Sequence, residues 1–393
     1  MNLDWSLLAP EYVLAGWAAL LVSVDLFWPG FRKEHLAYLA AAGALTAALT
    51  SLIWLGDDTD FANLVEINDY TTFFRLFFGL IAFFTIIASA RYVQDRLLHP
   101  GEYYALILLT NLGGNYMAGA KELLTAYIAL ELLSFSLYVL TSYAKFDLKS
   151  NEGGLKYMLL GAFSSAIFLY GISLIYGVTG TTQFEDIAVV VGGDTAGFRL
   201  PMFLGLVLII AGLGFKVAAV PFHMWTPDAY EGAPLPITAL ISAISKAAGF
   251  ALFLKLFAMA FLPLLDDWRL FIAALAAATM TLGNLVAIQQ HNIKRLLAYS
   301  SIGQVGFLLM GVAALSDANT DAASALVFHL AGYVVSNLAA FICAIVYYNW
   351  TGKDEIADYD GLAERAPFVA LCMSIALFSL AGMPLFAGFA TKF

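Results

Sequence analysis

Hydrophobic residues occur along this chain in twelve long runs, and short polar stretches separate them. Because a bilayer core requires about 20 apolar residues per helix, the pattern predicts twelve membrane helices at residues 12–28, 36–56, 72–90, 103–119, 122–143, 156–178, 202–220, 236–262, 270–289, 295–315, 322–348 and 366–393. The first run has no basic n-region and no cleavage site of small residues. We therefore expect it to remain as a membrane helix rather than to be removed as a signal peptide.

The composition supports this interpretation. Of the 393 residues, 61% are hydrophobic and only 12% are charged, whereas soluble domains carry about 25% charged residues. The net charge of −10 argues against a nucleic-acid partner. Cys343 and Cys372 both lie in apolar runs, which predicts neither a disulfide framework nor a metal cluster. We expect an all-α polytopic membrane protein that folds as one helical bundle in the lipid bilayer.

Basic residues predict which loops face the cytoplasm. Alternate loops carry ten of them: Arg32, Lys33, Arg91, Arg96, Lys145, Lys149, Lys294, Arg295, Lys353 and Arg365. The opposite loops carry four, namely Arg75 at a helix edge, Lys121, Arg199 and Arg269, beside acidic residues such as Asp57, Asp58, Asp60, Glu66, Asp69, Glu185, Asp186, Asp194, Asp266 and Asp267. The positive-inside rule then places the ten in the cytoplasm and the N-terminus outside.

Five charged residues lie in the apolar runs and are not assigned to helix ends or loops: Glu131, Lys216, Lys246, Lys255 and Lys392. A charged residue at a helix centre costs about 2.5–3.5 kcal/mol on insertion scales, so intramembrane charges are functional candidates by default. Glu131, Lys216 and Lys246 have no route to bulk water within a turn or two. They are the strongest candidates for proton transfer.

Structural explanations compete for Lys255, Asp25 and Lys156. Lys255 follows Lys246 by nine residues, which points it to the opposite helix face, and near the helix end it can snorkel to water. Asp25 is expected to be a solvated end group. Lys156 follows the SNEGG turn and suits either a cytoplasmic anchor or the mouth of a proton path.

Two predicted helices contain breaking residues close to a lysine. The first holds Pro221, Pro227, Pro234 and Pro236 after Lys216, and the second holds Gly382, Pro384 and Gly388 before Lys392. Proline interrupts a helix, and freed backbone groups are tolerated in a membrane only against protein or a wet cavity. Paired interruptions of this kind indicate an internal repeat and a binding site in transporters.

Two histidines are candidate relay residues. His223 follows Lys216 by seven residues, so a continuous helix would place both on nearly the same face. His329 lies in the run 322–348, near Tyr333 and Asn337, from which it could extend a path toward Lys392. Histidine titrates near neutral pH and can pass a proton between buried amines. Burial favours the neutral form of a lysine, whereas a nearby carboxylate favours its charged form. Movement of Glu131 relative to Lys216 would therefore change the proton affinity of the lysine and drive proton release.

Several motifs resemble one known family. They are ALELLSFSLYVL around Glu131, KSNEGGLKYMLLGAFSSAIFLYGISLIYG at 149–177, FKVAAVPFHMWTPDAYEGAP at 215–234, ISKAAGFA around Lys246 and NIKRLLAYSSIGQVGFLLMG at 292–311. The chain resembles the antiporter-like subunits of respiratory complex I, most closely the subunit N family (subunit 2 in mitochondria and chloroplasts). The resemblance implies an antiporter-like fold of fourteen helices with inverted five-helix repeats and broken helices, of which about twelve are present.

The resemblance also implies roles for particular residues. The functional glutamate of the family falls on Glu131 and its three lysines on Lys216, Lys246 and Lys392. The implied function is proton translocation coupled to quinone reduction. A single domain, 1–393, would comprise three N-terminal helices (1–100), a first repeat (101–262) and a second, truncated repeat (263–393).

The same resemblance implies the setting of the protein. No cofactor is expected in this chain, because FMN, iron–sulfur clusters and quinone would belong to other subunits of the complex. The expected partners are the neighbouring antiporter-like subunit M and the small subunits K and J. The expected location is the bacterial inner membrane, with a thylakoid or organelle membrane as the alternative. Because the chain stops one residue after Lys392, we expect the natural product to continue for about 80–100 residues, enough for two further helices.

Two other functions stay open at this point. The chain could serve a multisubunit cation/proton antiporter, which the KSNEGGLKY stretch disfavours, or a structural subunit that moves no protons. Nucleotide-binding glycine motifs and CxxC pairs do not occur in the sequence, so the energy source is expected to lie in other subunits.

Overall fold

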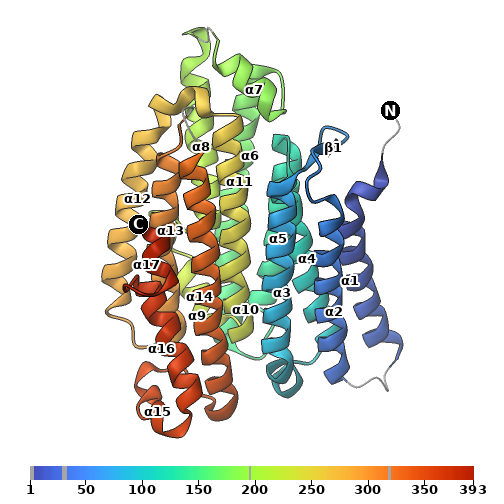
Figure 1. Ribbon diagram of the computed structural model, residues 1–393, viewed down its shortest axis with the longest axis vertical. Coiled ribbons are helices and arrows are strands. Elements are labelled where there is room, and N and C mark those ends of the chain that lie inside the picture. Colours follow the sequence, from blue (N-terminus) through green and yellow to red (C-terminus); the bar gives the residue numbers. More distant parts are fainter. Residues whose placement is uncertain (1–3, 29–32, 194–195, 317–319) are drawn as a thin grey trace.

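The computed structural model describes residues 4–28, 33–193, 196–316 and 320–393 (Figure 1). Arg32 and Asp194, both used in the charge comparison above, lie outside the described residues. The N-terminal half contains α1 (Ala9–Phe27), α2 (Lys33–Ser51), β1 (Thr59–Phe61), β2 (Val65–Ile67), α3 (Asp69–Arg96), α4 (Pro100–Gly119), α5 (Leu123–Thr141), α6 (Leu148–Thr179), α7 (Phe184–Val191) and α8 (Arg199–Val217). The second half contains α9 (Thr226–Gly232), α10 (Leu235–Leu240), η4 (Ile241–Ser245), α11 (Lys246–Met259), α12 (Leu265–Ala287), α13 (Ile293–Ala313), α14 (Asp321–Thr351), α15 (Leu362–Arg365), α16 (Pro367–Ala381) and α17 (Ala387–Lys392). Five short 3-10 turns complete the described part: η1 (Trp5–Leu8), η2 (Leu52–Trp54), η3 (Ala196–Phe198), η5 (Leu262–Leu264) and η6 (Ile356–Tyr359).

The long helices run side by side along one axis and form a single bundle (Figure 1). Within the described ranges, ten helices are long and apolar enough to cross a membrane. Of the other two predicted spans, α4 carries the polar stretch NLGGN, and α16 has only 15 residues. The all-α polytopic membrane fold is confirmed, whereas the number twelve remains a prediction.

Local chemistry determines where the helices begin and end. Asn68 caps α3 by accepting the Thr71 N–H at 3.0 Å, and Glu122 caps α5 by accepting the Thr125 N–H at 2.6 Å. These side chains satisfy donors that a helix start leaves without partners. Gly180 ends α6 in the left-handed region at φ 70°, a conformation that favours glycine.

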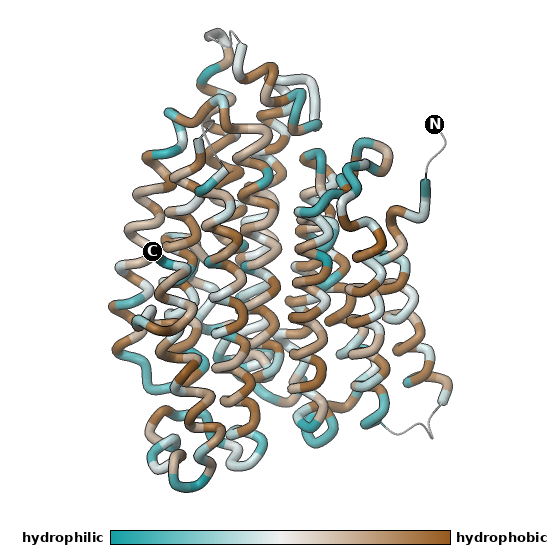
Figure 2. The backbone as a smooth tube through the Cα atoms, viewed as in Figure 1, coloured by the Kyte–Doolittle hydropathy of each residue, from teal (hydrophilic) through white to brown (hydrophobic). Residues whose placement is uncertain are grey.

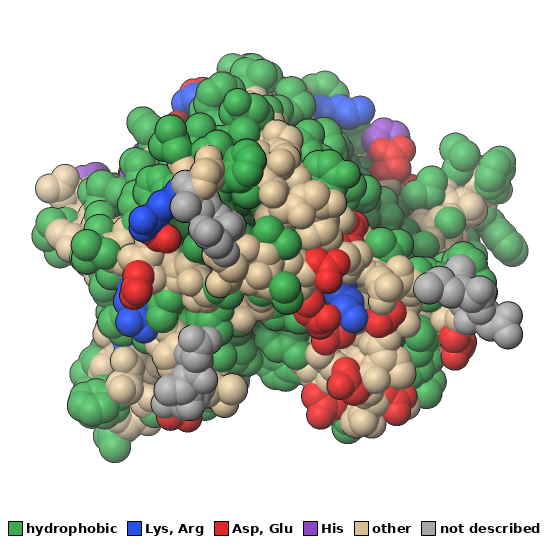
Figure 3. All heavy atoms as spheres, turned by 90° about the horizontal axis from the view of Figure 1, so that it is seen from above, with side chains coloured by type: hydrophobic (Ala, Val, Ile, Leu, Met, Phe, Trp, Pro, Cys, Tyr) green, Lys and Arg blue, Asp and Glu red, His purple; other side chains and the backbone are tan. Residues whose placement is uncertain are grey.

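Hydrophilic residues gather at both ends of the bundle, and the middle is apolar (Figure 2). The two ends differ in charge. The hairpin β1–β2 and the short helix α7 stand at the end where α3 begins; neither element was predicted (Figure 1). Figure 3 views this end, where acidic side chains are prominent. The described basic loops lie at the opposite end, as the alternation predicts.

Arg75 corrects one detail of that comparison. The sequence placed it at a helix edge, but it lies inside α3 with 1% of its surface exposed. Its Nε donates to Glu11 of α1 at 2.8 Å, and its Nη2 donates to the same carboxylate at 3.0 Å. The pair is a buried clamp between α1 and α3 rather than part of a loop.

Both predicted helix interruptions are confirmed. Helix α8 ends at Val217, where Ala218 takes a left-handed conformation with φ 66°, and the chain resumes as α9. Helix α16 ends at Ala381, where Gly382 has φ 81°, and α17 follows. Lys216 lies just before the first break, whereas Lys392 lies after the second. The two lysines therefore do not occupy equivalent places.

The segment α10–η4–α11 runs through the middle of the bundle. Every residue in its most apolar 18-residue window is buried, which holds for no other span in the described part of the chain. This segment carries Lys246 at the first position of α11. The bundle therefore encloses the central lysine on all sides.

Candidate functional site: a row of buried lysines

Lys216 is 3% exposed and lies in the last turn of α8. Its Nζ donates to Ser134 Oγ of α5 at 2.8 Å. The break beyond it frees main-chain oxygens, since the last four carbonyls of a helix have no helical donor. Side chains satisfy two of them: Trp225 Nε1 donates to the Phe215 oxygen at 3.0 Å and Ser245 Oγ donates to the Lys216 oxygen at 3.3 Å.

Glu131 lies one turn before Ser134 on α5 and is half-buried. Its carboxylate accepts a short hydrogen bond from Ser165 of α6. The predicted pairing of Glu131 with Lys216 is not a direct contact, because the ion pairs among the described residues do not include these two groups. The two serines stand between the carboxylate and the amine.

A cavity of about 10 Å³ connects the two serines. Ser134, Ser165 and Lys216 all line it, together with Gly161 and Gly212. Its volume is close to the minimum for one water molecule, which needs about 10–15 Å³ and polar partners. One water there would complete a hydrogen-bonded path between Glu131 and Lys216.

Lys246 is 2% exposed and directly follows η4, a π-helical turn of five residues. Such turns are rare and occur often at functional sites. The Lys246 Nζ donates to the Tyr230 hydroxyl of α9 at 3.2 Å and makes a short hydrogen bond to Ser301 Oγ of α13. These two hydroxyls are neutral partners, able to accept from a charged amine and to donate to a neutral one.

The π-helical turn also contacts α14. Tyr333 donates its hydroxyl hydrogen to the main-chain oxygen of Ser242 at 2.9 Å, and Asn337 Nδ2 donates to Ser242 Oγ at 2.6 Å. His329 lies one turn before Tyr333 on the same helix and is 5% exposed. Its Nδ1 shares a hydrogen bond of 3.0 Å with Thr391 Oγ1, next to Lys392.

Lys392 of α17, which is partly buried, forms the end of the row that begins with Glu131 and Lys216 and continues through Lys246 and His329. Its Nζ donates to the main-chain oxygen of Leu380 at 2.7 Å and lies 4.8 Å from the ring centroid of Phe307. Gln304 donates to the same Leu380 oxygen at 2.8 Å. The break after α16 exposes this carbonyl, so the second interruption creates the acceptor for the lysine.

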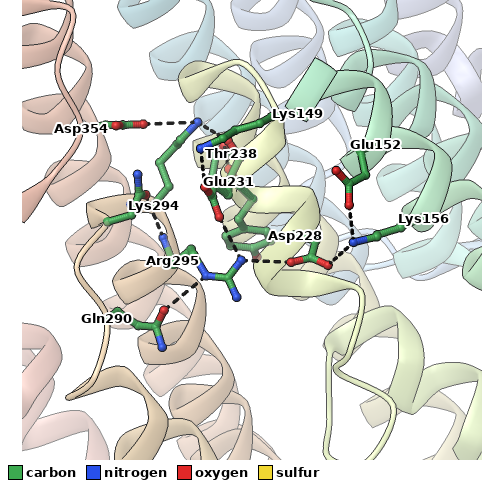
Figure 4. A network of polar contacts seen from close by, with 12 residues as sticks. Lys149, Glu152, Lys156, Asp228, Glu231, Thr238, Gln290, Lys294, Arg295 and Asp354 are labelled. Carbon is green, nitrogen blue, oxygen red and sulfur yellow. Dashed lines mark hydrogen bonds and ion pairs between the residues drawn. The ribbon is translucent and has the colours of Figure 1, made fainter. Parts of the chain in front are cut away.

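A network of ion pairs lies at the basic end of the bundle (Figure 4). Two carboxylates of α9 form its centre. Asp228 pairs with Lys156 at 2.7 Å and Arg295 at 3.0 Å, and Glu231 pairs with Lys149 at 2.8 Å and Arg295 at 2.9 Å. The network fixes α9 against α6 and α13.

These contacts alter the titration of both acids. Burial alone would raise the pKa of Asp228, but the hydrogen bonds from Lys156 and Arg295 outweigh burial and hold it below its usual range. Burial likewise opposes a lower pKa for Glu231, and the bonds from Lys149 and Arg295 again prevail. Both groups are therefore ionised at neutral pH.

Known proteins similar to this chain identify its family. The family model described as "NADH:quinone oxidoreductase/Mrp antiporter, TM" matches residues 120–393. The chain belongs to this family. NAD(P)H-quinone oxidoreductase subunit 2 of Synechocystis sp. is 44% identical over 397 residues, covering 100% of this chain and 75% of the relative. NADH-quinone oxidoreductase subunit N of Trichlorobacter lovleyi is 41% identical, covering 100% of this chain and 80% of the relative.

A solved structure agrees with this membership. One chain of respiratory complex I from Thermus thermophilus superposes with a TM-score of 0.79 at 29% identity, covering 98% of this chain and 81% of that chain. The fold predicted from the family motifs is therefore confirmed at the level of its antiporter-like architecture.

For a member of this family, the structure brings together most of the predicted residues. Glu131, Lys216, Lys246, His329 and Lys392 all lie in the row. His223 does not, because α8 ends at Val217 and the helical spacing from Lys216 does not continue beyond that residue. Lys156 lies in the network, paired with Glu152 as well as Asp228.

Lys255 has a different environment from the one expected. It is buried rather than exposed to water, and its Nζ forms an ion pair with Glu66 of β2 at 2.6 Å. It also contacts the main-chain oxygens of Ala118 and Gly119. The structural interpretation of Lys255 gains support from this pairing, although the snorkelling geometry was wrong.

Several residues of the row could not be predicted from the sequence. Ser134, Ser165, Tyr230, Ser301 and Thr391 are small or neutral polar residues that carried no charge signal. Tyr230 lies in the motif TPDAYEGAP, between Asp228 and Glu231. This position between two acids was the signal that could have marked it as a functional residue. Groups of three or more metal-binding side chains do not occur within the described ranges.

Proposed function

We propose that this chain is the subunit N-type proton-translocating membrane subunit of an NADH:quinone oxidoreductase. One observation carries the proposal. Lys216, Lys246 and Lys392 have no carboxylate within 4 Å among the described residues, whereas the buried Lys255 has Glu66. A buried unpaired ammonium is costly, and such an amine is suited to exchange protons with neighbouring hydroxyls.

In this proposal, protons enter at the basic end and reach Lys246 through Tyr230. Glu131, Lys216 and Lys246 are linked by the serine and tyrosine hydroxyls and by one water in the small cavity. His329 and Thr391 continue the path to Lys392. A shift of Glu131 toward Lys216 favours the charged amine, and its withdrawal favours proton release.

The redox chemistry would take place in other subunits, which would hold FMN, iron–sulfur clusters and quinone. We propose subunits M, K and J as membrane neighbours. The half-buried Glu131 supports a neighbour at α5 and α6, because a carboxylate at that depth is unfavourable against lipid and a second protein would cover it.

The charge difference between the two ends supports a cytoplasmic position of the basic end and an outer position of the N-terminus. The bacterial inner membrane is the proposed location. A thylakoid membrane is the alternative, because subunit 2 relatives occur in cyanobacteria such as Synechocystis sp..

Proton pumping by the purified complex in sealed vesicles tests the function. Lys246→Met is expected to reduce the rate of dye-reported proton uptake by about 10²-fold, in the range lost with a general acid–base group. Lys353→Met, at an exposed lysine paired with Asp358, is the matched control. Normal pumping by Lys246→Met would support a structural subunit, and proton flux that requires Na⁺ but no electron donor would support an antiporter.

A further inference from the structure

A large cavity opens at the basic end of the bundle, away from the lysine row. It has a volume of about 620 Å³ and lies between the α3–α4 loop, the α5–α6 loop and the end of α14. Arg96, His99 and Lys145 line it, as do the aromatic rings of Tyr92 and Tyr348. The proton path proposed above makes no use of it.

Unpaired cations converge on this cavity. Most of the described Lys and Arg residues at the basic end have a carboxylate within 4 Å; the exceptions are Lys33, Arg96, Lys145 and Arg365. Arg96 and Lys145 line the cavity, and Lys33 Nζ donates to the main-chain oxygen of Leu98, another lining residue, at 3.1 Å. Two of the four unpaired cations thus line one hollow, and a third contacts the backbone of a lining residue.

Arg96 is held in a fixed position. Its guanidinium lies 4.6 Å from the ring centroid of Tyr348 and 5.6 Å from that of Tyr92, and its Nη1 donates to the Tyr348 hydroxyl at 3.4 Å. Stacking of this kind orients a guanidinium while leaving donors free for an oxyanion.

Two carboxylates, Glu102 and Asp147, also line the cavity, and both lie at helix starts. Asp147 caps α6 by accepting the Lys149 N–H at 2.9 Å, and Glu102 stands in the first turn of α4. The positive ends of these helices partly compensate both charges. Among the described residues, neither carboxylate lies within ion-pair distance of Arg96 or Lys145, so both cations remain available to an anionic ligand.

Exposed apolar side chains surround the same opening. Phe146 is 88% exposed, and Leu98 and Val139 are about half exposed. They lie at the ends of membrane-crossing helices, where water meets lipid. A ligand with an anionic head and apolar tails would satisfy the cations and cover these side chains together.

We propose that this cavity binds the phosphate headgroup of an anionic phospholipid, with Arg96 and Lys145 as its cationic contacts. Basic pockets between membrane helices at the cytoplasmic side commonly bind such headgroups. The site is independent of the proton path, so the proposal holds whether or not the chain pumps protons.

Native mass spectrometry of the purified, partly delipidated complex tests this site with added phosphatidylglycerol. The double variant Arg96→Gln/Lys145→Gln is expected to bind it about 30-fold more weakly, since each cation contributes about 1 kcal/mol and 1.4 kcal/mol is tenfold. Lys145→Gln alone, on an exposed loop, is expected to lose about fivefold by the same conversion. The control Lys353→Gln/Arg365→Gln removes equal charge at the same end and is expected to retain wild-type binding.

Three results would overturn the proposal. One is equal phosphatidylglycerol binding by the double variant and the control. Another is displacement of the lipid by inorganic phosphate, which would identify a free-phosphate site. The third is that a photo-crosslinking residue in place of Asn151, which lines the cavity, captures a neighbouring subunit instead of lipid.

Discussion

Ser245, the residue immediately before Lys246, donates a hydrogen bond from its Oγ to the main-chain oxygen of Lys216 at 3.3 Å. The contact joins the broken end of α8 to the π-helical turn of the central helix. The backbone of Lys216 is thus hydrogen-bonded to Ser245, the residue next to Lys246 in the chain. We expect a movement at the end of α8 to reach Lys246 through this contact.

Ser245→Ala is expected to lower proton-pumping turnover about fivefold, because one buried hydrogen bond contributes about 1 kcal/mol. Turnover of the purified complex in vesicles measures the effect. Ser374→Ala serves as control, since Ser374 Oγ donates to the Ala370 oxygen on an exposed helix face. Equal turnover in both variants would show that the Ser245 contact does not couple the lysines.

Lys216→Ala is expected to leave the complex assembled and to reduce both pumping and quinone reduction by about 10²-fold. Lys216→Arg is expected to be little better, because a guanidinium stays protonated at any working pH and cannot release its proton. Parallel assays of quinone reduction and dye-reported pumping provide the measurement. Wild-type rates in Lys216→Ala would contradict the assignment.

Glu131→Gln tests the pairing of the carboxylate with the lysine. Gln preserves the shape and removes the charge that biases Lys216, so turnover is expected to fall to a level similar to that of Lys216→Ala. The double variant is expected to cost less than the sum of the single variants in free energy, because coupled groups are not additive. Strict additivity would mean that Glu131 and Lys216 act separately.

Lys255→Met is expected to affect stability rather than pumping. Removing one partner of a buried pair leaves Glu66 uncompensated and costs up to about 3 kcal/mol. The double variant Glu66→Gln/Lys255→Met is expected to recover much of this loss. Thermal unfolding of the assembled complex measures stability, and proton uptake per electron should stay unchanged; a reduced ratio would give Lys255 a place in the path.

Acid is expected to loosen the network at the basic end. The pKa values of Asp228 and Glu231 lie below their usual range in the folded chain. Their ionised forms therefore stabilise the fold above roughly pH 4, where unfolded acids are ionised, and this contribution is lost as the pH falls through the lowered values. Limited proteolysis near α9 across this range reports the loss, and Arg295→Gln is expected to move its onset to higher pH.

Hydropathy and breaking residues predicted most of the fold and all of the charged row. Helices such as α6 and α14 are long apolar runs, and the ends of α8 and α16 follow from proline and glycine. The partners of buried charges were beyond such reasoning. Glu66 and Lys255 are far apart in sequence, as are Glu11 and Arg75, and only the packed bundle brings each pair together.

The neutral residues of the row could not be predicted from the sequence either. A serine in an apolar helix normally bonds to its own backbone, as Ser134 Oγ also does with the Leu130 oxygen at 2.6 Å. Its second role, accepting from Lys216, depends on how closely α5 and α8 approach each other. His223 shows the opposite error, because a spacing rule was applied across a helix that ends at Val217.

The enclosed position of α10–η4–α11 has a consequence for biosynthesis. This segment leaves the ribosome before α13 and α14, which later pack against it. At that stage its two lysines have only the earlier helices as neighbours, and exposure to lipid would be unfavourable for both. We therefore expect the N-terminal helices to receive the segment during insertion, with Glu66, synthesised earlier, as the partner of Lys255. Insertion of this central helix is then expected to depend on the folded N-terminal half.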